Sequence, residues 1–317
     1  MTKREMYMSK YRYSKVSGDA SIREYISLEE DIDGEYTIVS KLNTPLHKIA
    51  IVEQEGNLLV YSGGYVMFST TDDEDRYSEA MVHIAMAAAA KRKRVLIIGG
   101  GGGITTREAL RYSDVRKITT LDLDEVIMKI GKKLEPVVAF NKGSLNHDKV
   151  KTVNEDGRKF LEETDKKWDV IILDLPEPSR KSVEVSRLYS VEFYSLLKER
   201  LNPGGAISIA CSNGDSTPQY LWSIYATLRD AGFHVLPYYY LEEDDADDWL
   251  YCLATTSEVN PNDLSMVVST KNLTTERLRQ MFDLPYYLNI AKNTGKIQTD
   301  DNTVLVDIID KAYYNFE

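Results

Sequence analysis

The sequence has few cysteines and no long apolar run. Its two cysteines, Cys211 and Cys252, cannot form a disulfide framework, and no group of cysteines and histidines has metal-ligand spacing, so we expect no metal site. The longest apolar candidate, Met81–Ala90, is well short of the roughly 18 residues that a membrane helix needs. Residues 1–12 are polar and basic and lack the apolar segment of a signal peptide, so we expect a cytoplasmic protein with no membrane partner.

Basic residues are also scarce. The 317 residues include 39 Lys and Arg against 50 Asp and Glu, which gives a formal net charge of −11. Because binding to a phosphate backbone needs a basic surface, we expect no nucleic acid partner, whereas a cationic substrate fits this charge. Acidic residues form two runs, at 72–75 and 242–248. Both runs could be solvated loops, or they could be loops that steer a polyamine or another cation towards a cleft.

Short apolar segments alternate with helical segments through the middle of the chain. We predict strands at 95–98, 117–121, 150–153, 170–173, 206–210, 234–236 and 249–254. We predict helices at 78–90, 105–112, 124–134, 157–164, 190–200 and 220–231. This alternation favours an α/β fold with a mostly parallel, doubly wound sheet.

The chain divides into three parts on the same pattern. Three β-rich runs between residues 36 and 68 predict a small antiparallel sheet ahead of the main domain. We therefore assign residues 1–80 to an N-terminal extension and β-subdomain, 81–256 to the catalytic domain, and 257–317 to a C-terminal subdomain packed on it.

Five consecutive glycines, Gly99–Gly103, follow one predicted strand and precede a helix. Glycine lets the backbone adopt positive φ and approach a ligand closely, and a helix N-terminus offers unpaired N–H groups. Asp122 ends the next strand, where a carboxylate can accept hydrogen bonds from both hydroxyls of a ribose. Asp124 is better placed than Asp122 to cap the following helix. These features together predict a nucleoside-binding site.

Acidic residues also follow the next two strands. Asp156 could accept a hydrogen bond from an adenine amino group or cap the helix that begins near Gly157, and the two roles are compatible. Asp174 and Glu177 lie in the segment Asp174–Pro178, where two prolines restrict the backbone. A carboxylate there can position an amine and accept its proton while the amine attacks a carbon next to a sulfonium. The sequence therefore predicts a group-transfer enzyme.

These residues together resemble the spermidine synthase (polyamine aminopropyltransferase) family, and most closely its bacterial branch with an Asp-Leu-Pro-Asp-Pro motif. The likeness runs from about Thr44 to the C-terminus and includes Phe68–Glu79, the glycine run and Asp174–Pro203. It implies a Rossmann-like class I S-adenosylmethionine-dependent transferase fold with a small N-terminal β-subdomain, usually as a homodimer. It also implies transfer of an aminopropyl group from decarboxylated S-adenosylmethionine to a polyamine or another amine, with release of methylthioadenosine.

The resemblance assigns roles to individual residues. Asp174 would handle the attacking amine, and Glu177 stands where the family usually has a second aspartate. Tyr77 matches the tyrosine of a Tyr-His-Glu element, and Tyr189 matches the tyrosine that follows the catalytic loop. The residues expected to bind the donor are Gly99, Gly100, Gly101, Gly102, Asp122, Leu123, Glu155, Asp156, Gly157 and His47.

Four elements depart from the family pattern. Gly102 replaces the aspartate that holds the donor's ammonium, and Ser78 replaces the histidine of the Tyr-His-Glu element. Ser62–Met67 replaces a Leu-Asp-Gly-x-x-Gln element, and Leu46–His47 replaces a Tyr-Gln pair. Because a carboxylate at position 102 would repel a donor with an α-carboxylate, its loss suggests that the pocket accepts intact S-adenosylmethionine.

Three hypotheses of function follow from these matches and departures. The first is transfer of a 3-aminopropyl or 3-amino-3-carboxypropyl group, because the segment Asp174–Pro178 is kept so fully. The second is methyl transfer to a small molecule or peptide, and the third is a non-catalytic nucleoside-binding protein. Aromatic residues do not decide among them: Tyr238–Tyr240 could enclose a cation or pack at a subdomain edge, and Trp222 and Trp249 are expected in the core.

Overall fold

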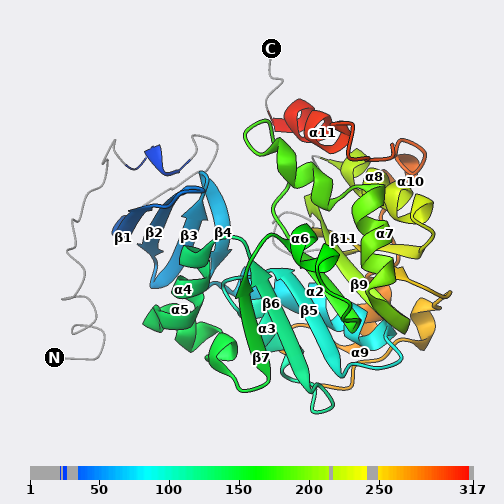
Figure 1. Cartoon of the computed structure of the whole chain (residues 1–317), viewed down its shortest axis with the longest axis horizontal. Coiled ribbons are helices and arrows are strands. Elements are labelled where there is room, and N and C mark those ends of the chain that lie inside the picture. The colour runs from blue at the N-terminus through cyan, green and yellow to red at the C-terminus, as the bar shows by residue number, and fades with distance from the viewer. Residues whose placement is uncertain (1–21, 23, 27–34, 214–216, 241–248, 314–317) are drawn as a thin grey trace.

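The computed structural model describes residues 22, 24–26, 35–213, 217–240 and 249–313 of the chain. The second acidic run, 242–248, lies outside the described residues. Two sheets organise the molecule, a small antiparallel one built from residues 36–69 and a larger one built from residues 94–255 (Figure 1).

The small sheet has four antiparallel strands in chain order. They are β1 (Tyr36–Asn43), β2 (Lys48–Gln54), β3 (Asn57–Ser62) and β4 (Tyr65–Ser69). Glu55-Gly56 joins β2 to β3 and Gly63-Gly64 joins β3 to β4, and all four residues have positive φ. Two-residue turns of this kind match the twist of the flanking strands, so both hairpins close tightly. The sequence predicted the sheet but not β4 as a separate strand.

The large sheet has seven strands in the order β10-β11-β9-β8-β5-β6-β7. The strands are β5 (Arg94–Gly99), β6 (Lys117–Asp122), β7 (Val150–Asn154), β8 (Trp168–Asp174), β9 (Leu201–Asn213), β10 (His234–Tyr240) and β11 (Trp249–Thr255). The strands β5 to β9 pair in parallel, and β11 and β10 add antiparallel pairs at one edge. This arrangement confirms the predicted mostly parallel α/β fold.

Helices cover both faces of the large sheet. They are α2 (Asp72–Ala88), α3 (Ile104–Ala109), α4 (Glu125–Lys133), α5 (Glu135–Phe140), α6 (Gly157–Glu162), α7 (Val191–Glu199), α8 (Pro218–Asp230), α9 (Thr275–Gln280), α10 (Tyr286–Ile290) and α11 (Val304–Tyr313). One face packs on α7, α8, α10 and α11, and the other packs on α2 and α9. Residues 257–313 therefore contribute helices to both faces of the sheet.

The small sheet is attached through a third apolar cluster. Its strands pack against Ile127 and Ile130 of α4 and Val137 of α5, and Figure 1 shows the two helices beside the sheet. Phe68 and Ile104 belong to the same cluster, so the end of β4 lies against the start of α3. The small sheet thereby borders the glycine run that precedes α3.

Several expectations change when the residues are placed in space. The acidic run Asp72–Asp75 is the first turn of α2 and not a loop, and β9 begins at Leu201, ahead of the predicted start at residue 206. Tyr238 is buried, stacks on Tyr251 at 5.0 Å between ring centroids, and does not enclose a cation. Trp222 is a core residue as predicted.

The division at residues 80 and 256 stays a prediction. Helix α2 runs through position 80 and packs against β8, β9 and β11 of the large sheet. Within the described parts of the chain, none of the helices is long and apolar enough to span a membrane.

Candidate active site

The glycine run and the acidic segment leave the sheet from neighbouring strands. Gly99 at the end of β5 pairs with Asp174 at the end of β8, and Asp122 ends β6 on the other side of β5. The chain order of the strands reverses at β5, because β6 and β7 lie on one side of it and β8 on the other. In open α/β sheets ligands bind at the carboxyl ends of strands at such a reversal. We therefore place the candidate site here.

Glycine is required in this loop because other residues approach it so closely. Gly99 and Gly100 have φ of 87° and 71°. A Cβ atom on Gly99 would lie 1.8 Å from the Asp174 carbonyl oxygen, and a Cβ on Gly101 would lie 2.4 Å from Asp122 Oδ2. The loop therefore packs closely against Asp174 at the end of β8 and Asp122 at the end of β6.

Asp122 is held by main-chain donors. Gly101 N donates to its Oδ2 at 2.9 Å, and Asp124 N donates to its Oδ1 at 2.9 Å. Burial raises the pKa of Asp122 to about 7. Asp124 caps α4, because its side chain accepts a hydrogen bond from Val126 N at 2.8 Å. The prediction that Asp124 is the residue that caps this helix is therefore confirmed. Leu123 between them is exposed.

The end of β7 carries the expected helix cap. Asp156 Oδ1 accepts from Lys159 N at 2.8 Å and caps α6, which confirms the capping role, whereas its contact with adenine stays a prediction. Glu155 Oε1 lies 3.4 Å from Lys159 Nζ. Gly157 allows close packing, because a Cβ there would lie 2.6 Å from Ile98 of β5.

Asp174 lies at the centre of the site. Tyr77 of α2 donates to its Oδ1 at 3.0 Å, and Thr105 of α3 donates to its Oδ2 at 3.2 Å. Burial raises the pKa of Asp174 to about 6, although both hydrogen bonds act to lower it. The carboxyl is thus ionised near neutral pH and can accept a proton from a bound amine. Thr105 was not among the predicted site residues.

Tyr189 positions the loop that follows Asp174. Its side chain is buried, and its hydroxyl donates to the carbonyls of Leu175 at 3.1 Å and Pro176 at 3.2 Å. It therefore holds the backbone of the acidic segment from behind and does not face the open side of the site. Glu177 in the same segment is partly buried; burial raises its pKa, while a hydrogen bond from Ser212 acts to lower it.

Glu74 of α2 is a site residue that the sequence analysis missed. Its Oε2 accepts from Ser69 N at 3.0 Å, and burial raises its pKa to about 8, with the nearby charge of Asp174 acting in the same direction. It stands three residues before Tyr77, on the same face of the helix. The helix was predicted to begin at Ser78, so its first turn was left out of the prediction and Glu74 was assigned to a loop.

The residues around Tyr77 are mostly structural. Its ring packs against Trp249 and Tyr251, at 5.1 and 5.8 Å between centroids. The Ser78 hydroxyl is buried and has no hydrogen-bond partner within the described chain. Glu79 accepts from the backbone N–H groups of Lys271 and Asn272, each at 2.9 Å, and so ties the C-terminal part to α2.

His47 lies on the rim of the site. It is exposed in the β1–β2 turn, and its backbone N–H donates to Thr44 Oγ1 at 2.9 Å. The Thr44 hydroxyl in turn lies 3.4 Å from Asp124 Oδ2, two residues beyond Asp122. The turn of the small sheet therefore reaches the strand end where the ribose is expected.

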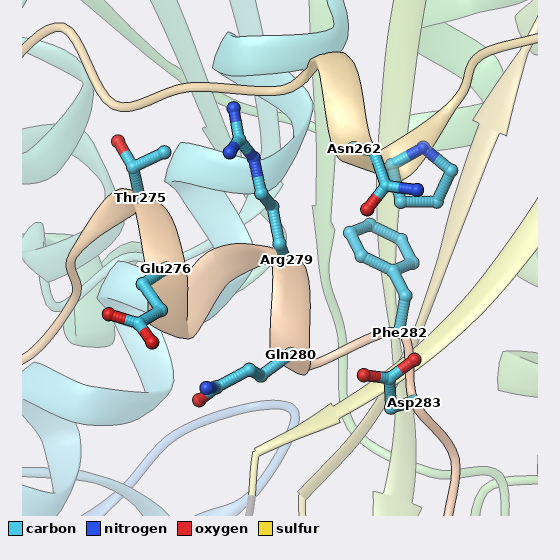
Figure 2. A pocket seen from close by; sticks show the side chains of 8 residues that line it. Asn262, Thr275, Glu276, Arg279, Gln280, Phe282 and Asp283 are labelled. Atoms are coloured by element: carbon cyan, nitrogen blue, oxygen red, sulfur yellow. The ribbon is translucent and has the colours of Figure 1, made fainter.

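A surface hollow of about 680 Å³ lies elsewhere, on the C-terminal helices. Figure 2 shows Glu276, Arg279 and Phe282 around it, with Arg279 extending towards the segment that carries Asn262. Arg279 Nε donates to Leu264 O at 2.9 Å, so this side chain braces the fold. None of the residues lining the hollow comes from the strand ends, and the candidate site is distinct from it.

Four partly buried carboxylates converge at the strand ends. They belong to Glu74, Asp122, Asp174 and Glu177, and each has a raised pKa. In the described part of the chain none of the four forms an ion pair with a lysine or arginine. No group of acids, cysteines and histidines there has the arrangement of a metal site. A positive charge bound among these carboxylates would favour their ionised forms and lower their pKa values.

Two curated relatives are similar to most of this chain. A curated polyamine aminopropyltransferase of Oceanobacillus iheyensis is 30% identical over 281 residues, 88% of this chain and 54% of the relative. A second, polyamine aminopropyltransferase 2 of Ralstonia nicotianae, is 31% identical over 246 residues, 77% of this chain and 48% of the relative. The chain thus spans about half the length of the curated relatives it matches.

Solved structures support the fold. Spermidine synthase from Thermotoga maritima superposes with a TM-score of 0.71 at 21% identity, covering 80% of this chain and 87% of that one. A spermidine synthase in complex with the transition state analogue AdoDATO gives a TM-score of 0.72 at 21% identity, covering 80% and 88%. The Rossmann-like fold is confirmed by these matches. Residues 74–264 match the spermine/spermidine synthase domain, and the chain belongs to this family.

Proposed function

We propose that the protein transfers an aminopropyl group from decarboxylated S-adenosylmethionine to an amine of the polyamine class and releases methylthioadenosine. The observation that carries the proposal is the position of Asp174, at the strand reversal, between the glycine loop and Tyr77. The names of the relatives, polyamine aminopropyltransferases, support the same reaction.

The nucleoside half of the donor would lie along β5 and β6. Both oxygens of Asp122 already accept one main-chain hydrogen bond, and each keeps a lone pair for a ribose hydroxyl. The exposed Leu123 offers an apolar contact for the adenine, and Asp156 follows at the next strand end. His47, from the turn of the small sheet near Asp124, would contact the donor next to its ribose.

The reaction would be a direct displacement. The lone pair of a neutral amine nitrogen attacks the carbon of the aminopropyl group that is bonded to sulfur, and a C–N bond forms as the C–S bond breaks. The electron pair of the broken bond stays on sulfur, which becomes the neutral thioether of methylthioadenosine. Asp174 accepts a proton from the nitrogen, because a pKa of about 6 leaves it ionised at neutral pH, and passes it to water.

The remaining carboxylates suit a polyamine acceptor. Glu177 lies in the same segment as Asp174 and is positioned by the loop that Tyr189 holds. We propose that Glu177 accepts a hydrogen bond from the acceptor's amine and directs it towards Asp174. We further propose a homodimer, as the family resemblance implies. The cytoplasmic location and the three-part division at residues 80 and 256 are proposed from the sequence pattern.

Identification of the sulfur by-product tests the reaction class. The purified protein is incubated with decarboxylated or intact S-adenosylmethionine and a panel of diamines and polyamines, and the nucleosides are separated by mass. Methylthioadenosine formed only when an amine is present supports the proposal. S-Adenosylhomocysteine as the product would mean methyl transfer, and no turnover with any amine would mean a binding protein.

A further inference from the structure

The loop cannot supply a side chain to the site at position 102. A Cβ atom on Gly102 would lie 2.9 Å from Cγ of Phe68 and 2.9 Å from Cδ1 of Ile104. Phe68 is buried in the apolar cluster that joins the small sheet to α3 and α4, so it cannot move aside cheaply. The space next to Gly102 is therefore apolar.

A carboxylate reaches the same region from the adjoining segment. Ser69 follows Phe68, and its N–H holds Glu74 Oε2 at 3.0 Å. Glu74 lies one helical turn before Tyr77, whose hydroxyl donates to Asp174, and the nearby charge of Asp174 helps to raise the pKa of Glu74. Glu74 thus contacts the residue that follows Phe68, whose ring borders Gly102, and lies one helical turn from the tyrosine that contacts Asp174.

Glu74 differs from the other acids of its helical turn. Asp72 pairs with Lys271, Asp73 pairs with Arg76 at 3.1 Å, and Asp75 pairs with Arg107 at 2.6 Å. Within the described residues Glu74 accepts one hydrogen bond and forms no ion pair. A partly buried carboxylate is costly without a cation, so this position is prepared for a positive charge that the chain itself does not provide.

Two of the main-chain N–H groups in the glycine loop already donate hydrogen bonds within the protein. Gly101 N donates to Asp122, and Gly103 N donates to the carbonyl of Gly100 at 2.9 Å. An α-carboxylate on a donor bound here would lie near the carboxylates of Glu74 and Asp174, which would repel it. The surroundings therefore disfavour a carboxylate and favour a bare ammonium.

We propose that Glu74 binds the ammonium of the donor's aminopropyl group and selects decarboxylated over intact S-adenosylmethionine. This inference rests on the proposed function for the identity of the donor. It also reverses the hypothesis drawn from Gly102, because the charge missing from the loop is supplied by the helix.

Binding measurements separate the ammonium contact from the nucleoside contacts. The variants are Glu74→Gln and, as a control on the same turn, Asp73→Asn, whose side chain is exposed. The ligands are decarboxylated S-adenosylmethionine, intact S-adenosylmethionine and methylthioadenosine, which has no ammonium. Calorimetry gives the three affinities for each protein, and melting temperatures confirm that both variants fold.

The inference expects Glu74→Gln to weaken the decarboxylated donor about tenfold or more, because a hydrogen-bonded charge pair is lost. The affinity for methylthioadenosine should stay within twofold, and Asp73→Asn should change neither value. Equal losses for donor and methylthioadenosine, or no loss for the donor, would overturn it, as would a wild-type preference for intact S-adenosylmethionine.

The two proposals fail in different ways. If the wild type binds the decarboxylated donor through Glu74 but transfers nothing to any amine, the reaction is wrong and the ammonium site stands. If methylthioadenosine forms with an amine while Glu74→Gln leaves donor affinity unchanged, the reaction stands and the ammonium site is wrong. If the wild type binds none of the three nucleosides, both are wrong.

Discussion

The two halves of the site hold their carboxylates in different ways. On the side proposed for the nucleoside, Asp122 and Asp156 accept hydrogen bonds from main-chain N–H groups. The donors to Asp122 are Gly101 and Asp124, and the donor to Asp156 is Lys159 in the following helix. On the amine side, Asp174 accepts from the side chains of Tyr77 and Thr105, which come from two different helices. The nucleoside side is built by local chain geometry, and the amine side by tertiary packing.

Under the proposed function, this difference separates the residues that bind the nucleoside from those that act on the amine. Main-chain donors fix a carboxylate regardless of nearby side chains, which suits the constant part of a substrate. Side-chain hydroxyls can be changed one at a time, and they tune the pKa of Asp174 without altering the strand that carries it. Substitutions on the two sides should therefore have separable effects.

The largest effect is expected from Asp174→Asn. The amide cannot accept the proton of the attacking amine, so kcat should fall about 10²- to 10⁴-fold. The affinity for methylthioadenosine, which contacts the other half, should change less than threefold. Steady-state assays of methylthioadenosine release and calorimetry check the two values. A similar loss in both would show that the two halves are not separable.

Asp122→Asn should give the opposite pattern. Loss of a charged acceptor for two hydroxyls should weaken methylthioadenosine and the donor alike, by about 10- to 100-fold. Asp124→Asn is the matched control, because Asp124 lies two residues after Asp122 but caps α4. It should cost at most about 1 kcal/mol of stability and leave both affinities within threefold. A larger affinity loss in the control would assign the ribose contact to the wrong aspartate.

The free protein should lose stability as the pH rises. Glu74 has a pKa of 4.5 when unfolded and about 8 when folded, so the folded state holds the extra proton between these values. Stability falls where the folded state binds more protons, hence from about pH 4.5 up to about pH 8.

Glu74→Gln should flatten this dependence. At pH 8.5 it should be about 1–2 kcal/mol more stable than the wild type, a discounted value because the side chain is partly open to solvent. Asp122 and Asp174, whose pKa values are also raised, account for the slope that remains. Urea denaturation at pH 5.5, 7.0 and 8.5 measures the free energy of unfolding of both proteins. The same change with pH in Glu74→Gln and the wild type would contradict the raised pKa of Glu74.

The smallest effect is expected from Tyr77→Phe. The Tyr77 hydroxyl lowers the pKa of Asp174 from the value that burial alone would give, so its loss should raise that pKa. The acid limb of kcat/KM should move to higher pH by about half a unit. Thr105→Val should act in the same direction. Because phenylalanine keeps the ring that packs against Trp249, a profile that keeps its position would contradict the role given to the Tyr77 hydroxyl.

The contrast between the halves also explains what the sequence could predict. The strand, the five glycines and Asp122 are neighbours in sequence or follow a fixed α/β pattern, so their meeting at one sheet edge and both helix caps could be predicted. The mostly parallel sheet was equally predictable, because short apolar runs alternating with helices allow few arrangements.

The amine side could not be predicted in the same way. Thr105 and Tyr77 meet Asp174 only after α2 and α3 pack together, and Tyr189 proves to brace the loop from behind. Glu74 was missed for a local reason as well. Four acids in the first turn stabilise a helix N-terminus, but their density was interpreted as a solvated loop.

The central claim is that Asp174 directs transfer of an aminopropyl group to an amine. The most direct test uses decarboxylated S-adenosylmethionine labelled with ¹³C in the aminopropyl carbons, together with a diamine, and follows the label by mass spectrometry. The account predicts that the label appears on the amine in equal amount to methylthioadenosine, and that Asp174→Asn slows the formation of both by about 10²- to 10⁴-fold. Label that stays with the nucleoside, or moves to the amine equally well in Asp174→Asn, would contradict it.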